Sequence, residues 1–332
     1  MSSLSLWLRL LMLLVFLGTN WGAAASQTSA PVARPLEPAS SKPVAVPTFG
    51  WWAEPQCADD GSMYFHADTE VFNDSVILKL SPDASTYALY ELDDQSSKDR
   101  SFAEFTVTPS GQVWLLTERR DGALGVFAFD SHGKAGNEVH IEGVEQLRPT
   151  AFAAFENGAL LIGGYHTSNA PKAVQGKPFF ALFEPSGKLR KNLVSPLPDV
   201  DPAEIGMKLR EGGATLGQDG NLYVLGPKEV LVLSESGSIV RRIAFTKPDK
   251  AATARRIVVS QNAMALWLAA PGSEDGAIFQ YLVLDRQNGD TIGLYVPHEL
   301  GRQAICFSRE DGFTFLRRNE NEKMKLEFAP LR

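Results

Sequence analysis

The stretch Gly217–Val224, which reads Gly-Gln-Asp-Gly-Asn-Leu-Tyr-Val, joins a tight turn to an apolar strand. The same arrangement occurs six times along the chain, each time with a short apolar run directly after the turn. The six turns are at Asp60-Gly61, Ser110-Gly111, Asn157-Gly158, Asp219-Gly220, Gln261-Asn262 and Asp311-Gly312. Successive turns are 50, 47, 62, 42 and 50 residues apart, a spacing typical of β-propeller blades. The sequence therefore predicts an all-β fold with six blades.

Each repeat has the pattern of a four-stranded antiparallel meander, and the second repeat shows it most clearly. Its expected strands are Phe102–Val107, Val113–Leu116, Gly125–Phe129 and Glu138–Ile141, all rich in β-branched and aromatic residues. The sixth repeat ends after three strands because the chain ends at Arg332. We therefore expect a segment within residues 43–52 to supply the missing strand and to close the ring between the N- and C-terminal blades.

The repeats resemble the six-bladed propeller families grouped around NHL repeats and the streptogramin-lyase-like and gluconolactonase-like proteins. The fourth repeat carries the likeness best, with Gly217–Val224, then Val230–Leu233, then the turn Ser236-Gly237. It departs from the NHL pattern where Leu225-Gly226 replaces the Asp that typically ends the second strand. The resemblance implies the blade architecture and transfers no catalytic residue to this chain.

Three regions are expected along the chain. Residues 1–25 have the pattern of a secretory signal: one charge, Arg9, precedes the apolar run Leu10–Leu17, and the small residues Ala23–Ala25 suit cleavage. An uncleaved membrane anchor is the alternative. Residues 26–48 contain five prolines among small residues and are predicted to form an extended tether. Residues 49–332 then form the propeller, in the periplasm or outside the cell, with no membrane span after cleavage.

Charge and cysteine content limit the function further. The net charge of −7 lacks the positive field on which nucleic-acid binding depends, and this excludes that class. The two cysteines, Cys57 and Cys306, lie in the first and last repeats, which are neighbours in a closed ring. They form either a disulfide across the seam of the ring or a pair of free buried thiols.

Arginine recurs where the chain enters the inner strand of a blade, near the expected mouth of the central channel. Guanidinium groups that converge there would suit a carboxylate or a phosphate. The alternative is that each arginine pairs with a carboxylate of the next blade and locks the blades together. The candidates for anion binding are Arg100, Arg148, Arg210, Arg256 and Arg302, together with Arg119, Tyr165 and Arg317 in nearby loops.

Catalytic and metal-binding signals are weak. His66 and His166 end the second strand of alternate blades and could face each other across the channel mouth, with Glu118 as a further acid or base. Two solvated loop histidines are the alternative. Asp199, Asp201 and Glu204 offer three oxygen ligands for Ca²⁺, although a solvated turn explains them equally well. No cofactor is predicted.

The sequence therefore favours an exported, monomeric propeller that acts as a binding or interaction module, with a small anionic molecule or a protein as its partner. An enzyme of the lyase or lactonase type, working at the channel mouth with or without a divalent metal, is the first alternative. A scaffold that binds proteins on its rim is the second. The fold alone does not decide among them.

Overall fold

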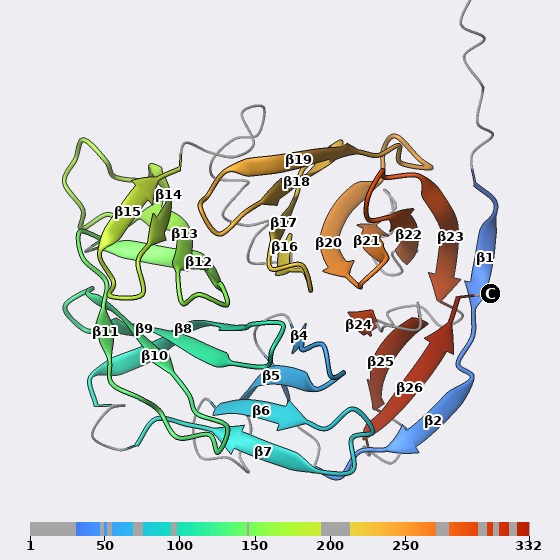
Figure 1. Cartoon of the computed structure of the whole chain (residues 1–332), viewed down its shortest axis with the longest axis horizontal. Helices are drawn as coiled ribbons and strands as arrows, with labels where there is room; N and C mark the ends of the chain where they lie inside the picture. Colours follow the sequence, from blue (N-terminus) through green and yellow to red (C-terminus); the bar gives the residue numbers. More distant parts are fainter. Residues whose placement is uncertain are drawn as a thin grey trace, which may run out of the picture. The chain divides into compact units, whose positions relative to one another are not determined.

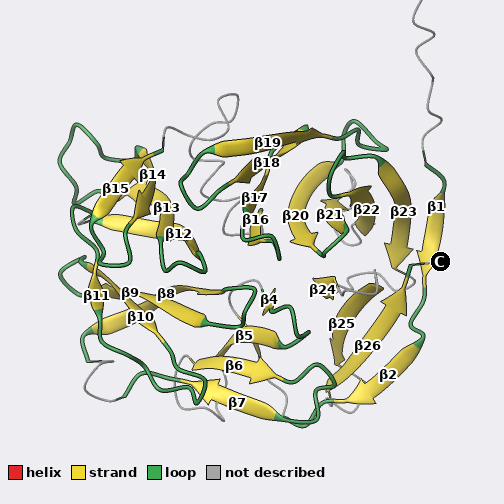
Figure 2. Ribbon diagram, in the orientation of Figure 1, coloured by secondary structure: helices red, strands yellow, loops and turns green. Residues whose placement is uncertain are grey.

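The structure, a computed structural model, describes residues 31–46, 50–51, 55–68, 76–93, 98–144, 146–193, 213–269, 279–297, 304–307, 312–318 and 324–331. The regular elements in these ranges are all β-strands (Figure 1, Figure 2). Within the same ranges, no helix has the length and apolarity needed to cross a membrane. The expected signal, residues 1–25, lies outside the described residues.

The strands form six sheets, one for each blade. The first blade contains β3 (Gly50–Trp51), β4 (Gln56–Cys57), β5 (Met63–Asp68), β6 (Val76–Leu80) and β7 (Tyr87–Tyr90). The second contains β8 (Arg100–Val107), β9 (Val113–Arg119), β10 (Leu124–Ala128) and β11 (Val139–His140). The third contains β12 (Leu147–Ala154), β13 (Leu160–His166), β14 (Pro178–Phe183) and β15 (Leu189–Asn192).

The other three blades follow the same order from the inside outward. The fourth contains β16 (Ala214–Leu216), β17 (Leu222–Leu225), β18 (Glu229–Leu233) and β19 (Ile239–Ala244). The fifth contains β20 (Thr253–Val259), β21 (Ala263–Ala269), β22 (Phe279–Asp285) and β23 (Thr291–Pro297). The sixth contains β24 (Ala304–Phe307), β25 (Gly312–Arg318) and β26 (Met324–Pro330). The predicted six-bladed propeller of antiparallel meanders is confirmed.

The repeated turn works as the sequence predicts. The first strand of each blade lies nearest the axis and the later strands lie progressively further out (Figure 1). The turn glycines Gly61, Gly111, Gly158 and Gly220 have φ angles of 84°, 88°, 80° and 72°. Glycine reaches this left-handed region at little cost, so the recurring glycine lets the chain reverse tightly between the first two strands.

The N-terminal segment closes the ring, but it does so earlier in the chain than predicted. Strand β2 (Ser40–Pro43) pairs antiparallel with β26 and supplies the fourth strand of the sixth blade. Strand β1 (Ala33–Leu36) pairs parallel with β23, on the outer edge of the fifth blade. The closing strand is therefore at 40–43, which overlaps the predicted range 43–52 only at Pro43. Part of the expected tether at 26–48 belongs to the sheets. Proline is compatible with both strands because each lies at a sheet edge.

The hydrophobic core consists of six clusters, one between each pair of adjacent blades. Strand β18 shows how alternation produces them. Leu231 and Leu233 face the third blade, whereas Val230 and Val232 face the fifth, and all four are at most 2% exposed. Burial of such a side chain contributes about 1.5–3 kcal/mol. Each blade is thus apolar on both faces, which is why its strands read as nearly continuous apolar runs.

Candidate functional site

The inner strands of all six blades surround a cavity of about 110 Å³ on the axis of the propeller. Each blade contributes three to five residues to its wall. These are Pro55, Gln56, Cys57, Glu104, Phe105, Thr106, Thr150, Ala151, Phe152, Ala153, Leu161, Ala214, Thr215, Leu216, Leu222, Arg256, Ile257, Val258, Val259, Ile305, Cys306 and Phe307. Propellers characteristically leave a central channel at this position, so the cavity is the candidate functional site.

Breaks in strand register lie beside the polar side chains of the wall. The pairing of β8 with β9 shifts between Phe102 and Glu104, and that of β20 with β21 shifts between Ala254 and Arg256. In β12 the shift skips Thr150. A β-bulge changes the direction in which nearby side chains point. The bulges therefore interrupt the alternation of side-chain direction along these strands. Without the bulges, that alternation would point these residues into the space between adjacent blades.

Three of the polar residues in the wall are threonines. Thr106, Thr150 and Thr215 come from the second, third and fourth blades. Thr150 is 6% exposed, and its Oγ1 has no hydrogen-bond partner among the described residues. Buried polar atoms nearly always have such a partner, supplied by protein, water or ligand. Sequence reasoning missed these residues because single threonines at strand positions form no recognisable motif.

Arg256 acts as a clamp at the seam of the ring. It is 4% exposed and donates from Nη1 to the Ala304 carbonyl at 2.9 Å, and from Nη2 to the carbonyls of Pro55 and Ile305 at 3.1 and 3.4 Å. One side chain of the fifth blade thereby binds the sixth and the first blades. These contacts resemble the locking role considered as an alternative for the arginines, except that the acceptors are backbone carbonyls and not carboxylates.

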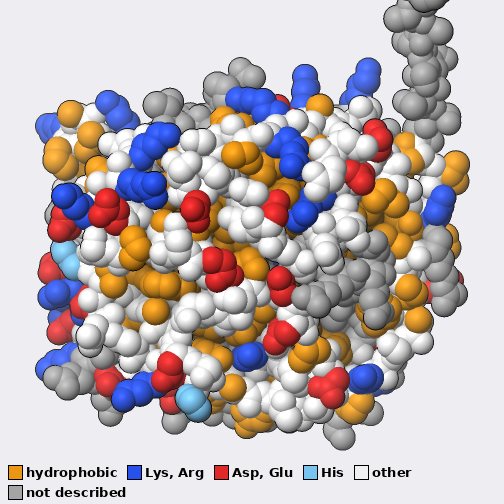
Figure 3. Space-filling model, viewed as in Figure 1, with side chains coloured by type: hydrophobic (Ala, Val, Ile, Leu, Met, Phe, Trp, Pro, Cys, Tyr) orange, Lys and Arg blue, Asp and Glu red, His pale blue; other side chains and the backbone are white. Residues whose placement is uncertain are grey.

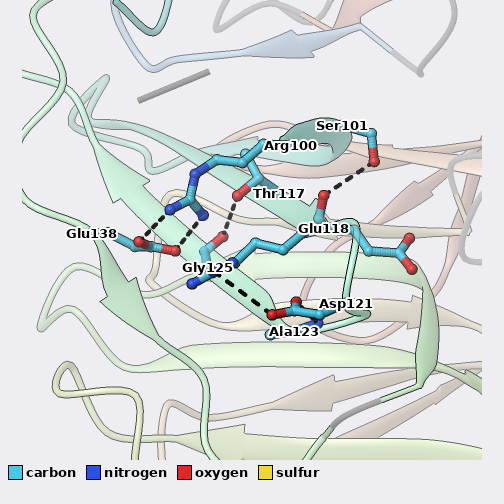
Figure 4. A network of polar contacts seen from close by, with 9 residues as sticks. Arg100, Ser101, Thr117, Glu118, Asp121, Ala123, Gly125 and Glu138 are labelled. Atoms are coloured by element: carbon cyan, nitrogen blue, oxygen red, sulfur yellow. Dashed lines mark hydrogen bonds and ion pairs between the residues drawn. The ribbon is translucent and has the colours of Figure 1, made fainter. Parts of the chain in front are cut away.

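Three other predicted arginines have carboxylate partners within their own blades. Figure 4 shows Arg100 with Glu138, which its guanidinium contacts through two parallel hydrogen bonds. This pair lies across Gly125, where a Cβ atom would meet a Glu138 oxygen at 2.0 Å. The two remaining pairs are looser, Arg119 with Asp121 at 3.7 Å and Arg317 with Glu327 at 3.9 Å.

The remaining anion-binding candidates are not brought together with Arg256. Arg148 is exposed and lies opposite Tyr165 in the pairing of β12 with β13, and neither lines the cavity as the described residues define it. Arg210 and Arg302 lie outside the described residues. On the face of the molecule in Figure 3, basic and acidic side chains are interspersed.

Of the two candidate histidines, His66 lies between the first and second blades and His166 packs within the third. The His66 ring stacks on Phe102 of the second blade, with ring centroids 3.5 Å apart, and the residue is 8% exposed. His166 packs edge-on against Phe179 of its own blade at 5.8 Å. Because both rings are held by aromatic neighbours, the expectation of two solvated loop histidines does not describe them. Glu118 is half-buried, and its backbone carbonyl accepts a hydrogen bond from Ser101 (Figure 4).

The calcium candidates Asp199, Asp201 and Glu204 lie outside the described residues. Among the residues that are described, no group of three or more His, Cys, Asp or Glu side chains is placed to hold a metal ion.

The two cysteines meet at the seam. In the structure Cys57 of β4 and Cys306 of β24 form a disulfide with a Cα–Cα distance of 5.9 Å. The bond joins the inner strands of the first and last blades, and both residues belong to the cavity wall. The disulfide and the Arg256 clamp therefore stabilise the same junction.

A charge cluster joins the fourth and fifth blades. The Tyr223 hydroxyl donates to Asp219 Oδ2 at 2.8 Å, and Arg286 Nη1 lies 3.7 Å from the same oxygen. Burial raises the pKa of Asp219, but hydrogen bonds from Asn221 and Tyr223 and the charge of Arg286 outweigh it, and the net shift is downward. Burial, followed by the bond to Asp219, raises the pKa of Tyr223. This cluster locks two blades and does not line the axial cavity.

Comparison with known proteins agrees with the fold. No protein-family model matches the chain, and no curated protein matches it by sequence. Among solved structures, a member of the DUF4221 family from Bacteroides vulgatus has a TM-score of 0.58 at 11% identity, covering 92% of this chain and 99% of that one. A luciferin-regenerating enzyme has a TM-score of 0.50 at 12% identity, covering 89% and 96%. At such identities the likeness shows the β-propeller fold alone.

Proposed function

We propose that this chain is an exported binding protein whose ligand site is the cavity on the propeller axis. The observation that carries the proposal is the cavity itself, whose wall combines polar residues such as Gln56, Thr106 and Thr215 with apolar residues from all six blades. Small-molecule sites commonly combine an apolar wall with a few polar groups that fix orientation. The Cys57–Cys306 disulfide supports a place outside the cytoplasm, in the periplasm or beyond.

The anionic ligand expected from the arginine pattern receives less support. Four of the eight candidates, Arg100, Arg119, Arg256 and Arg317, already have partners in the protein. The kinship with the NHL and gluconolactonase group remains part of the proposal on the strength of the blade pattern. The lyase or lactonase alternative would need a catalytic set at the cavity, and His66 and His166 are packed against aromatic rings away from its wall.

A rim-binding scaffold is the second candidate, and one observation favours it. Large apolar side chains are exposed at the starts of four outer strands. These are Tyr87, Leu189, Ile239, Val240 and Ile292, which are 39% to 54% exposed. These residues lie on β7, β15, β19 and β23. A protein partner held there would be insensitive to changes in the cavity.

The test is a ligand screen of residues 26–332 by thermal shift and ligand-detected NMR, repeated with the cavity blocked. Thr215→Phe places a large ring in the cavity wall, and Thr291→Phe makes the same change at an exposed rim position. We expect ligands that bind the wild type and Thr291→Phe but not Thr215→Phe. A ligand at one hundred times its dissociation constant adds about 2.7 kcal/mol of stability, which such a screen detects. Equal binding by all three proteins would contradict the axial site.

A further inference from the structure

The fourth blade has an open outer strand. The outer strands β23 and β26, with seven residues each, are covered by β1 and β2. The outer strands β7, β11 and β15 are short, with four, two and four residues. Strand β19 has six residues, and no further strand pairs with its outer side among the described residues. A long open edge is a template for pairing with another chain.

The backbone of β19 is oriented to accept such a strand. The Phe245 N–H donates to the Lys228 carbonyl at 3.0 Å, and bonded pairs alternate along an antiparallel ladder. Ile243 and Arg241 therefore bond to β18. The N–H and C=O groups of Arg242, which lies between them, point to the open edge.

The fifth blade shows a strand added at the corresponding position. Arg242 lies opposite Leu231 of β18, and Leu294 lies opposite the equivalent residue of β22, Leu282. Strand β1 begins its parallel pairing with β23 at Leu294. The outer edge of a blade in this fold therefore accepts a fifth strand, at a position that the described residues leave open in β19 (Figure 1).

The side chains along this edge are apolar and basic. Ile239 and Val240 are 43% and 54% exposed. Arg241 donates to a backbone carbonyl of the fifth blade at 3.1 Å. Arg242 pairs with Glu229, yet 47% of its side chain remains exposed. Apolar and cationic side chains next to each other on a strand suit a partner strand that alternates apolar and acidic residues.

The charge of the surrounding blades also favours an acidic partner. Residues 146–250, which span the third and fourth blades, contain 13 Lys and Arg residues and 10 Asp and Glu residues. Their net charge is +3, although that of the whole chain is −7. Such complementary charge speeds the encounter with an acidic segment and selects against a basic one.

We propose that β19 is a docking edge for an extended acidic segment of a partner protein, which adds to the fourth blade as a fifth strand. The backbone of the segment pairs with that of Arg242, and its apolar side chains lie against Ile239 and Val240. No residue of β19 lines the axial cavity. The docking edge therefore does not depend on the axial site.

The probe is a fluorescein-labelled hexapeptide amide, Glu-Val-Glu-Val-Glu-Val, and its binding to residues 26–332 is measured by fluorescence anisotropy. A Lys-Val peptide of the same length tests the charge. The Glu-Val peptide with every backbone nitrogen methylated keeps the side chains but has no N–H to donate, so it tests the backbone pairing.

Two variants of one residue separate charge from backbone pairing in the protein. Arg242→Gln removes the charge and keeps the N–H, whereas Arg242→Pro removes both. Proline is tolerated on an edge strand where the N–H points outward. Asn192→Pro is the matched control, because Asn192 occupies the corresponding position on β15. Circular dichroism checks that each variant is folded.

We expect the Glu-Val peptide to bind more tightly than the Lys-Val and methylated peptides. Arg242→Gln should weaken it about 1.5- to 5-fold, the effect of one exposed ion pair. Arg242→Pro should weaken it about 2- to 12-fold more, the factor that corresponds to one hydrogen bond. Asn192→Pro and the cavity variant Thr215→Phe should bind it as the wild type does.

Equal binding of the methylated peptide, or by Arg242→Gln and Arg242→Pro, would overturn strand addition. Tighter binding of the Lys-Val peptide would overturn the acidic partner. If no peptide binds, β19 is not a docking edge. If Thr215→Phe alone abolishes binding, the peptide occupies the axis, which contradicts the docking edge and leaves the axial site standing.

Discussion

Replacing Arg256 by methionine should weaken the ring at its seam. Methionine retains an unbranched apolar stem but removes the donors to Ala304, Pro55 and Ile305. The bonds at 2.9 and 3.1 Å are of normal length, whereas the bond at 3.4 Å is long and contributes little. A hydrogen bond that involves a charged group contributes about 1.5–3 kcal/mol. We therefore expect a loss of about 3–5 kcal/mol, a large part of the ~5–15 kcal/mol by which a typical protein is stable.

The assay is urea unfolding of residues 26–332 with the disulfide intact, followed by tryptophan fluorescence and circular dichroism. Arg148→Met is the matched control, because this arginine is exposed and a surface substitution usually changes stability by less than about 0.5 kcal/mol. Arg256→Lys keeps the charge but loses the planar fork that reaches three acceptors, so it should recover only part of the loss. If Arg256→Met and Arg148→Met differ by less than about 1 kcal/mol, the hydrogen bonds at the seam do not hold the ring together.

Three further predictions follow from the geometry of the blades. Gly187 and Gly220 both have positive φ, 84° and 72°, but a Cβ on Gly187 would lie 2.0 Å from a carbonyl oxygen of the neighbouring blade, whereas nothing lies within 4 Å of one on Gly220. Thermal unfolding should show Gly220→Ala losing about 1–2 kcal/mol from backbone strain and Gly187→Ala losing at least ~1 kcal/mol more from the clash; equal losses would contradict this. The pKa of Asp219 is lower in the folded protein than its unfolded value of about 3.9. Ionised Asp219 therefore stabilises the fold above a pH of about 3.9, and this stability is lost as the pH falls through the lower folded pKa. Urea unfolding at pH 5 and pH 3 should therefore show a smaller pH dependence for Asp219→Asn than for the wild type, and an unchanged dependence would refute the assignment. Finally, the disulfide closes a loop with a sequence separation of 249, and Cys57→Ser should lower the stability by about 2–5 kcal/mol, abolishing the effect of reductant on the unfolding midpoint; a reductant-insensitive wild type would count against the bond.

The blades could be predicted from the sequence because their signals are local. Four of the six turns have a glycine with positive φ, and the adjoining strands are apolar on both faces. The closing strand β2 could be expected in principle but not located. Its residues Ser40–Pro43 are all exposed and polar or proline, so no apolar pattern marks them. Backbone pairing with β26 places the strand, and backbone groups are the same in every residue.

The site was harder to predict because it depends on contacts between distant residues. The arginine pattern marks where the chain enters each inner strand, but the bulge beside Arg256 changes the direction in which nearby side chains point. The partners of the arginines are equally non-local. Glu138 lies 38 residues from Arg100, and Pro55 lies 201 residues from Arg256. No local sequence motif marks such pairs. The sequence could therefore indicate that arginines recur but not which group each arginine binds.

The most direct test of the axial site is a crystal structure of residues 26–332 with a ligand found in the thermal-shift screen. The account predicts electron density for the ligand on the propeller axis, in contact with Thr215 and Val258 of the cavity wall. Density for the ligand at the rim, with the axial cavity filled only by water, would contradict it.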